Sequence, residues 1–431
     1  MAKVVMIIVI ILNGVSQYVV SFCLMLPTQV DIAIVGAGPQ SLTLATFLLQ
    51  KRRSMRHRFM VFDPSGTWMS RWQYQFAALE IPHLRSPAVH HPDPNPFALR
   101  AFAEGRSHEL HSPYDLPGTK LFQDFCQEVI QRWELDDRVC AAQVVRVEPM
   151  PQSRFPFRLW LQDGQTILAR RVVVANGGSG VHCPAWVDAI PTPYPDDRLL
   201  HSTHIDLRQL HLQGERILII GGGLTSGHLA VGAASRGAQV LLMARRQIHE
   251  KLFDADPGWL GPKYLKDFWA EPNWMTRWQM IQAARNGGSM TPAMVTRLRR
   301  LERTGQITIY EQCQVAQAVW QGTHWRICCN QQAVHHCIHP LPIDRIWLST
   351  GSTLDVTEQS LLAEVLATYP TSIVNGLPVL DEHLRWQGCE LFMMGGLAAL
   401  QVGPTARNLS GGRMASERIV PALTKPSLAR S

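Results

Sequence analysis

The fold is decided near the start of the chain by residues 30–42, which read VDIAIVGAGPQSL. The apolar, mostly β-branched run before Gly36 is typical of a buried parallel strand, and the leucines and alanines after Pro39 repeat at helical spacing. Gly36 predicts a tight turn, and Gly38 predicts a close approach of the backbone to a phosphate. Pro39 suits a first helical turn, where its missing N–H costs no hydrogen bond. The stretch therefore predicts a strand, a phosphate-binding turn and a helix.

Two further residues strengthen this interpretation. Ser41 stands where the pattern G-x-G-x-x-G has its third glycine, and it is small enough for the helix to pack on its strand. Asp63 ends the next apolar run, residues 58–63, where a carboxylate accepts hydrogen bonds from a nucleotide ribose. The alternative for Asp63 is a plain turn with the Pro-Ser-Gly that follows it.

Length and composition favour an enzyme of two ordinary domains. The chain has 431 residues, of which 46% are hydrophobic and 17% are charged. Its formal charge of +7 and its isoelectric point of about 9.0 come from basic residues spread along the chain. No run of Lys and Arg with interleaved aromatic residues predicts a nucleic-acid surface. Anionic cofactors are a sufficient reason for the basic balance.

Cysteine usage indicates a reducing compartment. The nine cysteines are an odd number with no disulfide-framework spacing. No two of them are separated by two or by four residues, which disfavours the disulfide-reducing flavoenzymes.

The N-terminal segment differs from the rest of the chain. Residues 4–26 carry no charge, and a segment of that length is long enough to span a bilayer as a helix. Three interpretations compete: a signal peptide or anchor, a peripheral membrane contact, and a true start at Met25. Export would remove the rest of the chain from reduced nicotinamide, so the second and third are preferred.

The opening pattern occurs a second time. The apolar run 216–220 leads into Gly221 and Gly223, a helix of small residues follows, and residues 238–244 predict the next strand. Arg245 and Arg246 then stand where an acid would hold a free ribose hydroxyl. A guanidinium there suits the extra phosphate of NADP, although a solvated pair at a strand end is the alternative. The chain is therefore expected to hold two dinucleotides.

The segments between and after the two units predict the connecting architecture. A long loop is expected over residues 64–96, a helix over 120–130, and helices over 253–303. Residues 144–148, 157–161 and 166–169 predict a meander followed by a separate strand at 171–175, and a second meander is expected over 314–343. A strand over 345–349, a strand over 391–396 and a helix start at 403–408 follow. We predict no metal site: neighbours in the second meander would point to opposite faces, so its Cys and His residues, Cys328, Cys329, His335, His336, Cys337 and His339, are assigned a structural role.

This order predicts an α/β fold with two nested Rossmann-like dinucleotide-binding domains. The expected segments are an apolar N-terminal extension over 1–28, an FAD-binding domain over 29–205, an NAD(P)-binding domain over 206–340, and a return segment of the first domain over 341–425.

From residue 30 to about 420 the chain resembles the FAD- and NAD(P)-dependent flavoprotein monooxygenases, and most of all the lysine and ornithine N-hydroxylases of siderophore synthesis. The resemblance rests on the Gly-Ala-Gly-Pro at Gly36, on the Gly-Thr-Trp that ends at Trp68, and on residues 79–85. In residues 79–85, Glu80 and Arg85 stand where that group has a Gln and a Lys beside the flavin. The C-terminal Gly-Asp of many relatives is Gly395-Gly396 here. Because of these departures, the amino-acid substrate is not carried over.

The resemblance implies FAD and NADPH as cofactors and assigns roles to individual residues. His83 is expected to donate a proton, and Arg85 to steady a negative oxygen species or the NADP phosphate; a structural loop role is the alternative for both. Gly403 is expected at a helix start beside the flavin. The expected cofactor-binding residues are Gly36, Gly38, Pro39, Gln40, Ser41, Asp63, Trp68, Gly221, Gly223, Thr225, Ser226, Arg245, Arg246, Gly351, Gly395 and Gly403.

The implied activity is an NADPH-dependent oxidoreductase that transfers oxygen from a flavin peroxide to a small nucleophilic, amine-like substrate. The alternatives are an NAD(P)H-dependent reductase or quinone-type dehydrogenase and a flavin-binding regulatory protein without turnover. The expected partners are a small molecule and molecular oxygen, with no nucleic acid and with membrane contact through the N-terminus as an open alternative. The expected location is the cytoplasm, and the sequence predicts no oligomeric state.

Overall fold

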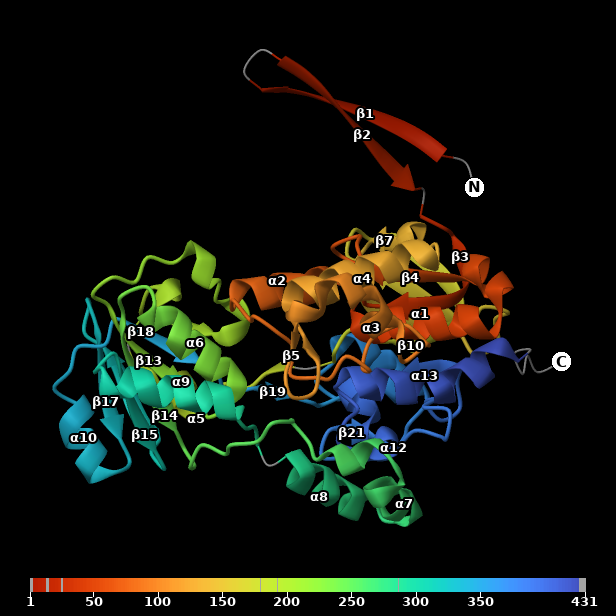
Figure 1. Ribbon diagram of the computed structural model, residues 1–431. Coiled ribbons are helices and arrows are strands. Elements are labelled where there is room, and N and C mark those ends of the chain that lie inside the picture. Colours follow the sequence, from red (N-terminus) through yellow and green to blue (C-terminus); the bar gives the residue numbers. More distant parts are fainter. Residues whose placement is uncertain are drawn as a thin grey trace.

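This computed structural model describes residues 3–12, 15–24, 26–178, 180–191, 193–285 and 287–425, and of residues 3–24 only the backbone. The chain forms two lobes, each built around a sheet with helices packed on it (Figure 1). This is the α/β fold with two dinucleotide-binding domains that the sequence predicts.

The first sheet holds the first predicted unit. Its strand order is β7-β4-β3-β10-β9-β8, and β22 pairs with β10. The strands β7, β4, β3, β10 and β22 run parallel, whereas β9 and β8 are antiparallel additions. The strand bounds are β3 (Gln29–Val35), β4 (Phe59–Asp63), β7 (Val139–Ala141), β8 (Val144–Pro149), β9 (Phe157–Leu161), β10 (Thr166–Val174) and β22 (Leu391–Met393).

The second sheet is entirely parallel and has the order β12-β18-β13-β14-β15. Its strands are β12 (Leu199–His201), β13 (Arg216–Ile220), β14 (Gln239–Ala244), β15 (Ile307–Glu311) and β18 (Arg345–Leu348). Strands β12 and β18 lie just outside the predicted 206–340 segment and yet pair within this sheet. The domain bounds at 205 and 340 stay a prediction.

Helices bury the apolar faces of both sheets. In the first lobe α1 (Pro39–Lys51) packs along α13 (Leu409–Thr424), and α4 (Thr119–Arg132) contributes six buried side chains to the same core. In the second lobe α6 (Leu224–Ala234) packs against α9 (Pro292–Arg303). Each lobe therefore has its own core, with the carboxyl ends of the parallel strands left to face a ligand.

Two helices cross from one lobe to the other. The helices α7 (Pro262–Ala270) and α8 (Trp274–Arg285) follow β14 in sequence but lie against the first lobe (Figure 1). Arg277 donates to the carbonyl oxygen of Leu400 at 3.2 Å, and the Trp269 indole donates to that of Gln401 at 3.0 Å. Leu265 and Phe268 belong to the core of the first lobe. The crossing segment therefore ties the lobes together.

The shorter elements complete the chain. Strand β11 pairs with β19 where the chain passes between the lobes, and β16 pairs with β17 as a hairpin. The remaining bounds are β1 (Lys3–Leu12), β2 (Val15–Leu24), β5 (Leu110–His111), β6 (Leu116–Pro117), β11 (Gly180–Val181), β16 (Val315–Trp320), β17 (Trp325–Cys329), β19 (Ser352–Thr353), β20 (Ile373–Val374), β21 (Leu377–Pro378), α2 (Ser70–Ala78), α3 (Ala98–Phe102), α5 (Ala185–Asp188), α10 (Gln332–Ile338), α11 (Ala363–Thr368) and α12 (Ala399–Val402).

Four sequence-based expectations are corrected. The expected loop over 64–96 contains helix α2, whose periodicity is masked by its polar residues. Residues 166–174 form one strand, β10, instead of two, because the strand extends past the meander to pair with β3. The third strand expected in the second meander is helix α10, so His335, His336 and Cys337 lie on a helix. The C-terminal helix α13 begins at Leu409, and Gly403 instead caps the end of α12.

Strands β1 and β2 pair antiparallel at the N-terminus, and Met25 lies outside the described residues. Within the part of the chain that the structure describes, no helix combines the length and the apolar character needed to cross a membrane. In that same part, no three His, Cys, Asp or Glu side chains are grouped so as to hold a metal ion.

Candidate cofactor and substrate site

The first glycine turn joins β3 to α1, and its two glycines, Gly36 and Gly38, have different surroundings. Gly36 has a φ of +97°, and a Cβ there would lie 2.8 Å from Cα of Asn176 and 2.9 Å from the carbonyl oxygen of Ala175. Its N–H donates to the carbonyl oxygen of Phe62 at 2.8 Å. Gly38, in contrast, would have no neighbour within 4 Å of a Cβ. The turn is thus packed against the sheet at Gly36 and open to a ligand at Gly38.

The second turn, between β13 and α6, repeats this construction in the other lobe. Gly221 has a φ of +147°, a Cβ there would collide with the carbonyl oxygen of Ser349, and its N–H donates to Met243 at 2.9 Å. Gly223 again has nothing within 4 Å. The two lobes therefore present equivalent open turns, each at a helix N-terminus that favours an anion.

Ser41 and Ser226 occupy the same place in the two turns. Both side chains are fully buried. The Ser41 hydroxyl donates to the carbonyl oxygen of Gly36, and the Ser226 hydroxyl donates to that of Gly223 at 2.6 Å. Each serine therefore stabilises the backbone of its turn from the buried side and does not point toward the ligand.

Asp63 and Trp68 support the first turn from the next strand. The Asp63 carboxylate accepts from the N–H of Ala37 at 3.0 Å and from the N–H of Ser65 at 3.0 Å. The Trp68 side chain is buried, and its indole donates to the carbonyl oxygen of Leu135 at 2.9 Å. These contacts favour a structural role for Trp68 and place Asp63 directly beside the glycine turn.

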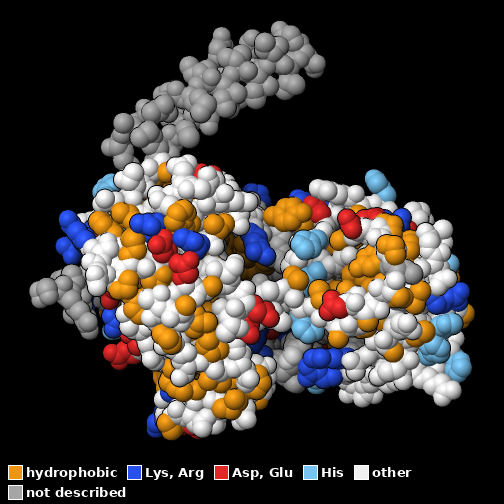
Figure 2. All heavy atoms as spheres, turned by 180° about the vertical axis from the view of Figure 1, so that it is seen from behind, with side chains coloured by type: hydrophobic (Ala, Val, Ile, Leu, Met, Phe, Trp, Pro, Cys, Tyr) orange, Lys and Arg blue, Asp and Glu red, His pale blue; other side chains and the backbone are white. Residues whose placement is uncertain are grey.

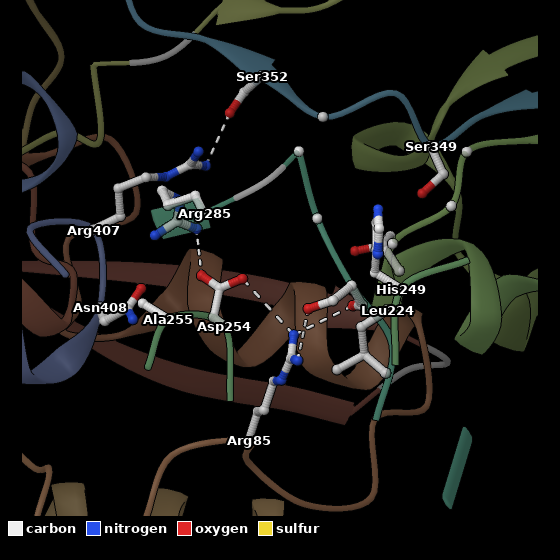
Figure 3. A pocket seen from close by; sticks show the side chains of 18 of the residues that line it. Arg85, Leu224, His249, Asp254, Ala255, Arg285, Ser349, Ser352, Arg407 and Asn408 are labelled. Carbon is white, nitrogen blue, oxygen red and sulfur yellow. Dashed lines mark hydrogen bonds and ion pairs between the residues drawn. The ribbon is translucent and has the colours of Figure 1, made fainter. Parts of the chain in front are cut away.

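Both turns border one cavity of about 980 Å³ that lies between the lobes. Figure 2 shows the surface hollowed between the two lobes, and Figure 3 shows the side chains that converge there. Eight of the residues expected to bind a cofactor line this cavity: Pro39, Gln40, Gly221, Gly223, Thr225, Arg245, Arg246 and Gly351. The expected catalytic residue Arg85 lines it as well. A volume of this size suits a ligand held between two domains.

Gln40 carries an unsatisfied polar atom at the first turn. Its Nε2 donates to the carbonyl oxygens of Ala406 at 3.3 Å and Asn408 at 3.0 Å. Its Oε1 is buried and has no hydrogen-bond partner among the described residues. A buried acceptor without a donor points to a missing ligand or water, so the first turn fits a bound dinucleotide such as FAD.

Arg245 and Arg246 follow β14 and line the cavity beside the second turn. Both are exposed, and neither makes a hydrogen bond or an ion pair with any described residue. Free guanidinium groups beside an open glycine turn fit the extra phosphate of NADP, which they can bind through charge-assisted hydrogen bonds.

Arg85 lines the cavity, but its guanidinium donates hydrogen bonds to other residues of the chain. It donates to the carbonyl oxygens of Leu252 at 2.9 Å, Lys251 at 2.6 Å and Ser289 at 3.3 Å, and to the Ser289 hydroxyl at 2.9 Å. Burial lowers the pKa of its guanidinium. Arg85 therefore joins the loop after α2 to the chain on either side of α7 and α8.

His83 is not among the residues that line the cavity. Its Nδ1 lies 3.0 Å from the carbonyl oxygen of Leu84, and its ring centre lies 4.8 Å from that of His111. These contacts favour the structural alternative for His83 over a proton donor.

The C-terminal glycines lie near the cavity without lining it. Gly395 has a φ of +73° and open space where a Cβ would be, and Gly403 has a φ of +99° and faces Leu265. At Gly396 a Cβ would lie 2.6 Å from Leu354 and 3.3 Å from Cγ of Arg407. A side chain at Gly396 would therefore require the Leu354 and Arg407 side chains to shift.

Sequence reasoning missed a charged cluster on the cavity wall. Asp254 forms an ion pair with Arg285 and lies 3.7 Å from Arg85, and Arg407 lies close by (Figure 3). Asp254 and Arg285 come from the Trp-rich helical region, which has no motif, and Arg407 comes from a stretch read only for its glycine and proline. Only the fold brings these three side chains together.

Comparisons with known proteins agree with this architecture. A family model described as FAD-NAD(P)-binding matches residues 33–179. No curated protein sequence is significantly similar to the chain. Among solved structures, the ornithine N-hydroxylase of Kutzneria sp. 744 has a TM-score of 0.73 at 17% identity, covering 92% of this chain and 99% of that chain.

Two other solved structures widen the comparison. L-lysine 6-monooxygenase from Pseudomonas syringae has a TM-score of 0.69 at 16% identity, covering 91% of this chain and 99% of that chain. The bacillithiol disulfide reductase of Bacillus cereus has a TM-score of 0.58 at 17% identity, covering 92% and 98%. The chain therefore has the fold of the flavoproteins with two dinucleotide-binding domains.

Proposed function

We propose that the protein is an FAD-dependent oxidoreductase that uses NADPH and transfers oxygen to a small nucleophilic, amine-like substrate. One observation carries the proposal: two glycine turns of equal construction border one cavity, and the second has two unpaired arginines at its phosphate end. The first turn would hold FAD and the second NADPH.

The residues of the chain would bind and orient the two coenzymes and enclose the reacting centre. Gly38 and Gly223 leave room for the two pyrophosphates, and Arg245 with Arg246 would select NADPH over NADH. FAD, when bound, supplies hydride acceptance and oxygen activation. The wall of the cavity, which includes Trp72 and Phe76, would keep water from the reacting centre.

The solved structures support the choice of reaction. The Kutzneria protein is an ornithine N-hydroxylase described with reduced FAD, NADP+ and L-ornithine. It and the lysine monooxygenase share more of this fold, by TM-score, than the disulfide reductase does. A monooxygenase acting on an amine is therefore the preferred activity, and we place it in the cytoplasm, where NADPH is available.

A reductase is the second candidate, favoured by the likeness to the bacillithiol disulfide reductase. Cys313 is the one cysteine among the described residues that line the cavity. Its side chain is 1% exposed, and burial raises its pKa, which disfavours the reactive thiolate. Disulfide reduction through this thiol is thus the weaker proposal.

Three assays on the FAD-loaded protein distinguish the candidates. A monooxygenase should oxidise more than one equivalent of NADPH per FAD only with oxygen present, and it should couple that turnover to a hydroxylated amine. A quinone reductase should turn over equally well without oxygen when a quinone is supplied. Bound FAD with negligible NADPH oxidation by any acceptor would leave only a regulatory role, and a protein that binds no flavin would contradict the whole proposal.

A further inference from the structure

Two cysteines of the second lobe are neighbours at the open end of the β16–β17 hairpin. Cys329 ends β17 and pairs with Val315 of β16, and the N–H of Asn330 donates to the carbonyl oxygen of Gln314 at 3.0 Å. Cys313 stands two residues before Val315, so alternation along the chain points it to the same face as Cys329. The register therefore makes the two side chains diagonal neighbours on one face.

The thiols of this pair contact each other. Both side chains belong to one buried cluster of the second lobe, where Cys313 is 1% and Cys329 is 9% exposed. The Cys329 thiol lies within hydrogen-bonding reach of the Cys313 sulfur and donates to it. A disulfide requires two cysteines whose side chains point at each other over a short distance, and this pair meets that requirement.

The surroundings of the two thiols differ, and the difference sets the order in which they react. Burial raises the pKa of both thiols, to about 12 for Cys329. At Cys313, hydrogen bonds from the Cys329 thiol and from the backbone of Gln331 lower the pKa and so oppose the effect of burial. Cys313 also lines the cavity between the lobes, whereas Cys329 is not among the lining residues. Cys313 is thus the thiol that a small oxidant meets first, and its burial makes the reaction slow.

The backbone of Cys313 connects this pair to the proposed coenzyme site. Its N–H donates to the carbonyl oxygen of Ala244 at 3.2 Å, and Ala244 is followed by Arg245 and Arg246. We propose that Cys313 and Cys329 form a reversible disulfide, and that this modification weakens the binding of NADPH at the end of β14. The effect on NADPH rests on the proposed function, whereas the disulfide itself does not.

Hydrogen peroxide is the oxidant, and the chemistry balances in two steps. The Cys313 thiolate attacks one oxygen of the peroxide, the O–O bond breaks and hydroxide leaves, so that a sulfenic acid forms on Cys313. The Cys329 sulfur then attacks the Cys313 sulfur, the S–S bond forms, and the hydroxyl group leaves as water. The two thiols lose two electrons and two protons, and one peroxide becomes two molecules of water. A small thiol such as dithiothreitol reverses the oxidation by exchange.

The disulfide acts on the coenzyme site through the backbone. The sulfur atoms of a disulfide lie about 2 Å apart, much closer than two hydrogen-bonded thiols, so the bond draws Cys313 toward β17. Cys313 is thereby pulled away from Ala244, which precedes the arginines expected to hold the extra phosphate of NADPH. The proposed reaction also supplies the oxidant, because an oxygenating flavin whose site admits water releases hydrogen peroxide.

The test compares the parent protein with Cys329→Ser, which removes the second thiol, and with Cys337→Ser as the matched control. Cys337 is an exposed cysteine on α10 of the same lobe. Each protein is treated with hydrogen peroxide, free thiols are then blocked, and a non-reducing peptide map identifies linked cysteines. The affinity for NADP+ is measured by calorimetry before oxidation, after oxidation, and after treatment with dithiothreitol.

Peroxide should link Cys313 to Cys329 in the parent and in Cys337→Ser but not in Cys329→Ser. The linked protein should bind NADP+ at least about threefold more weakly, and dithiothreitol should restore the affinity. The proposal is overturned if the map of the parent protein shows no link between Cys313 and Cys329, or if the linked and reduced proteins bind NADP+ equally. If Cys329→Ser fails to fold, the parent protein and Cys337→Ser decide. A reduced protein that binds no NADP+ would contradict the proposed function, whereas the peptide map would still test the disulfide.

Discussion

Gly36 and Gly38 belong to one turn, but the structure itself requires glycine only at Gly36. Gly36 combines a φ of +97° with backbone atoms of Ala175 and Asn176 at less than 3 Å from any added Cβ. Gly38 has a φ of −81° and no such neighbour. The first glycine is therefore needed by the fold, and we propose that the second leaves room for the ligand.

Alanine substitutions at Gly36 and at Gly38 separate the effect on folding from the effect on FAD binding. Gly36→Ala should lower the free energy of unfolding by about 2 kcal/mol or more, because the strained backbone and its neighbours cannot both be kept. Gly38→Ala should leave it unchanged within about 1 kcal/mol but weaken FAD by about tenfold, because the methyl group fills the pyrophosphate space. Urea unfolding of the apoprotein and FAD titration measure these effects. Equal losses of stability in the two variants would contradict this division.

Arg245 and Arg246 are predicted to set the preference for NADPH over NADH. Replacing both by alanine should raise the Michaelis constant for NADPH by about tenfold or more and change that for NADH by less than about twofold, because only NADPH carries the extra phosphate. Arg300→Ala, on the exposed side of α9, should change neither. If the double variant affects NADPH and NADH equally, the assignment to NADP is lost.

At the scale of the elements, Arg85 ties the loop after α2 to the two chain segments that flank α7 and α8. Lysine has the charge but not the planar fork that reaches three carbonyl oxygens and a hydroxyl. Arg85→Lys should therefore lower the free energy of unfolding by about 1–3 kcal/mol, measured by urea unfolding of the FAD-loaded protein, while NADPH still reduces the flavin. A variant of unchanged stability that no longer accepts hydride would restore the catalytic interpretation of Arg85.

Helices α2 and α6 are joined by an ion pair between lobes. Glu80, just after α2, accepts from Arg236, just after α6, at 2.7 Å. The hydrogen bond from Arg236 lowers the pKa of Glu80 from its ordinary value of 4.5. Because the folded-state pKa is the lower one, the pair contributes stability above pH 4.5, and this contribution is lost as the pH falls through the folded-state pKa.

Glu80→Gln should therefore cost less than about 1 kcal/mol at neutral pH, since the pair is partly exposed, and nothing once the pH is below the folded-state pKa. Urea unfolding between neutral pH and the acid limb measures the difference from the parent protein. Glu417→Gln, an exposed glutamate on α13 without a described partner, is the control. A deficit that persists unchanged in acid would show that the ion pair is not its cause.

The elements that the sequence predicts well are those with local signals. The strand at 29–35, the helix after Pro39 and the second unit after residue 216 follow from apolar periodicity and from glycines at fixed positions. Helix α2 was missed because its sequence is polar, and α10 because a Cys- and His-rich run has no clear period. Lengths of connections and helix starts, such as Leu409 in place of Gly403, depend on tertiary packing instead.

The candidate site likewise contains residues that local motifs predict and residues that only the fold brings together. Gly36, Gly38, Gly221, Gly223 and the arginine pair after β14 come from motifs. Of these, Gly221, Gly223, Arg245 and Arg246 line the cavity, whereas Gly36 and Gly38 lie just before Pro39 and Gln40, which line it. In the cluster of Asp254, Arg285 and Arg407, Arg407 lies more than 100 residues along the chain from the other two, so no local sequence pattern predicts the cluster. Long-range contacts of this kind need the fold before they can be seen.

For the whole molecule, the arrangement of the lobes matters more than either turn alone. The carboxyl ends of the two sheets face one cavity, and α7 with α8, Arg85 and the β11–β19 pair link the lobes around it. Two dinucleotides bound at these turns would meet between the lobes, where a hydride can pass from one to the other.

The most direct measurement mixes the FAD-loaded protein with NADPH in the absence of oxygen and follows the flavin absorbance. Bleaching of the flavin at a rate that saturates with NADPH, and that is slower with equal NADH, is the predicted result. A protein that retains FAD but stays fully oxidised with either nicotinamide would contradict the claim that both turns serve one shared cavity.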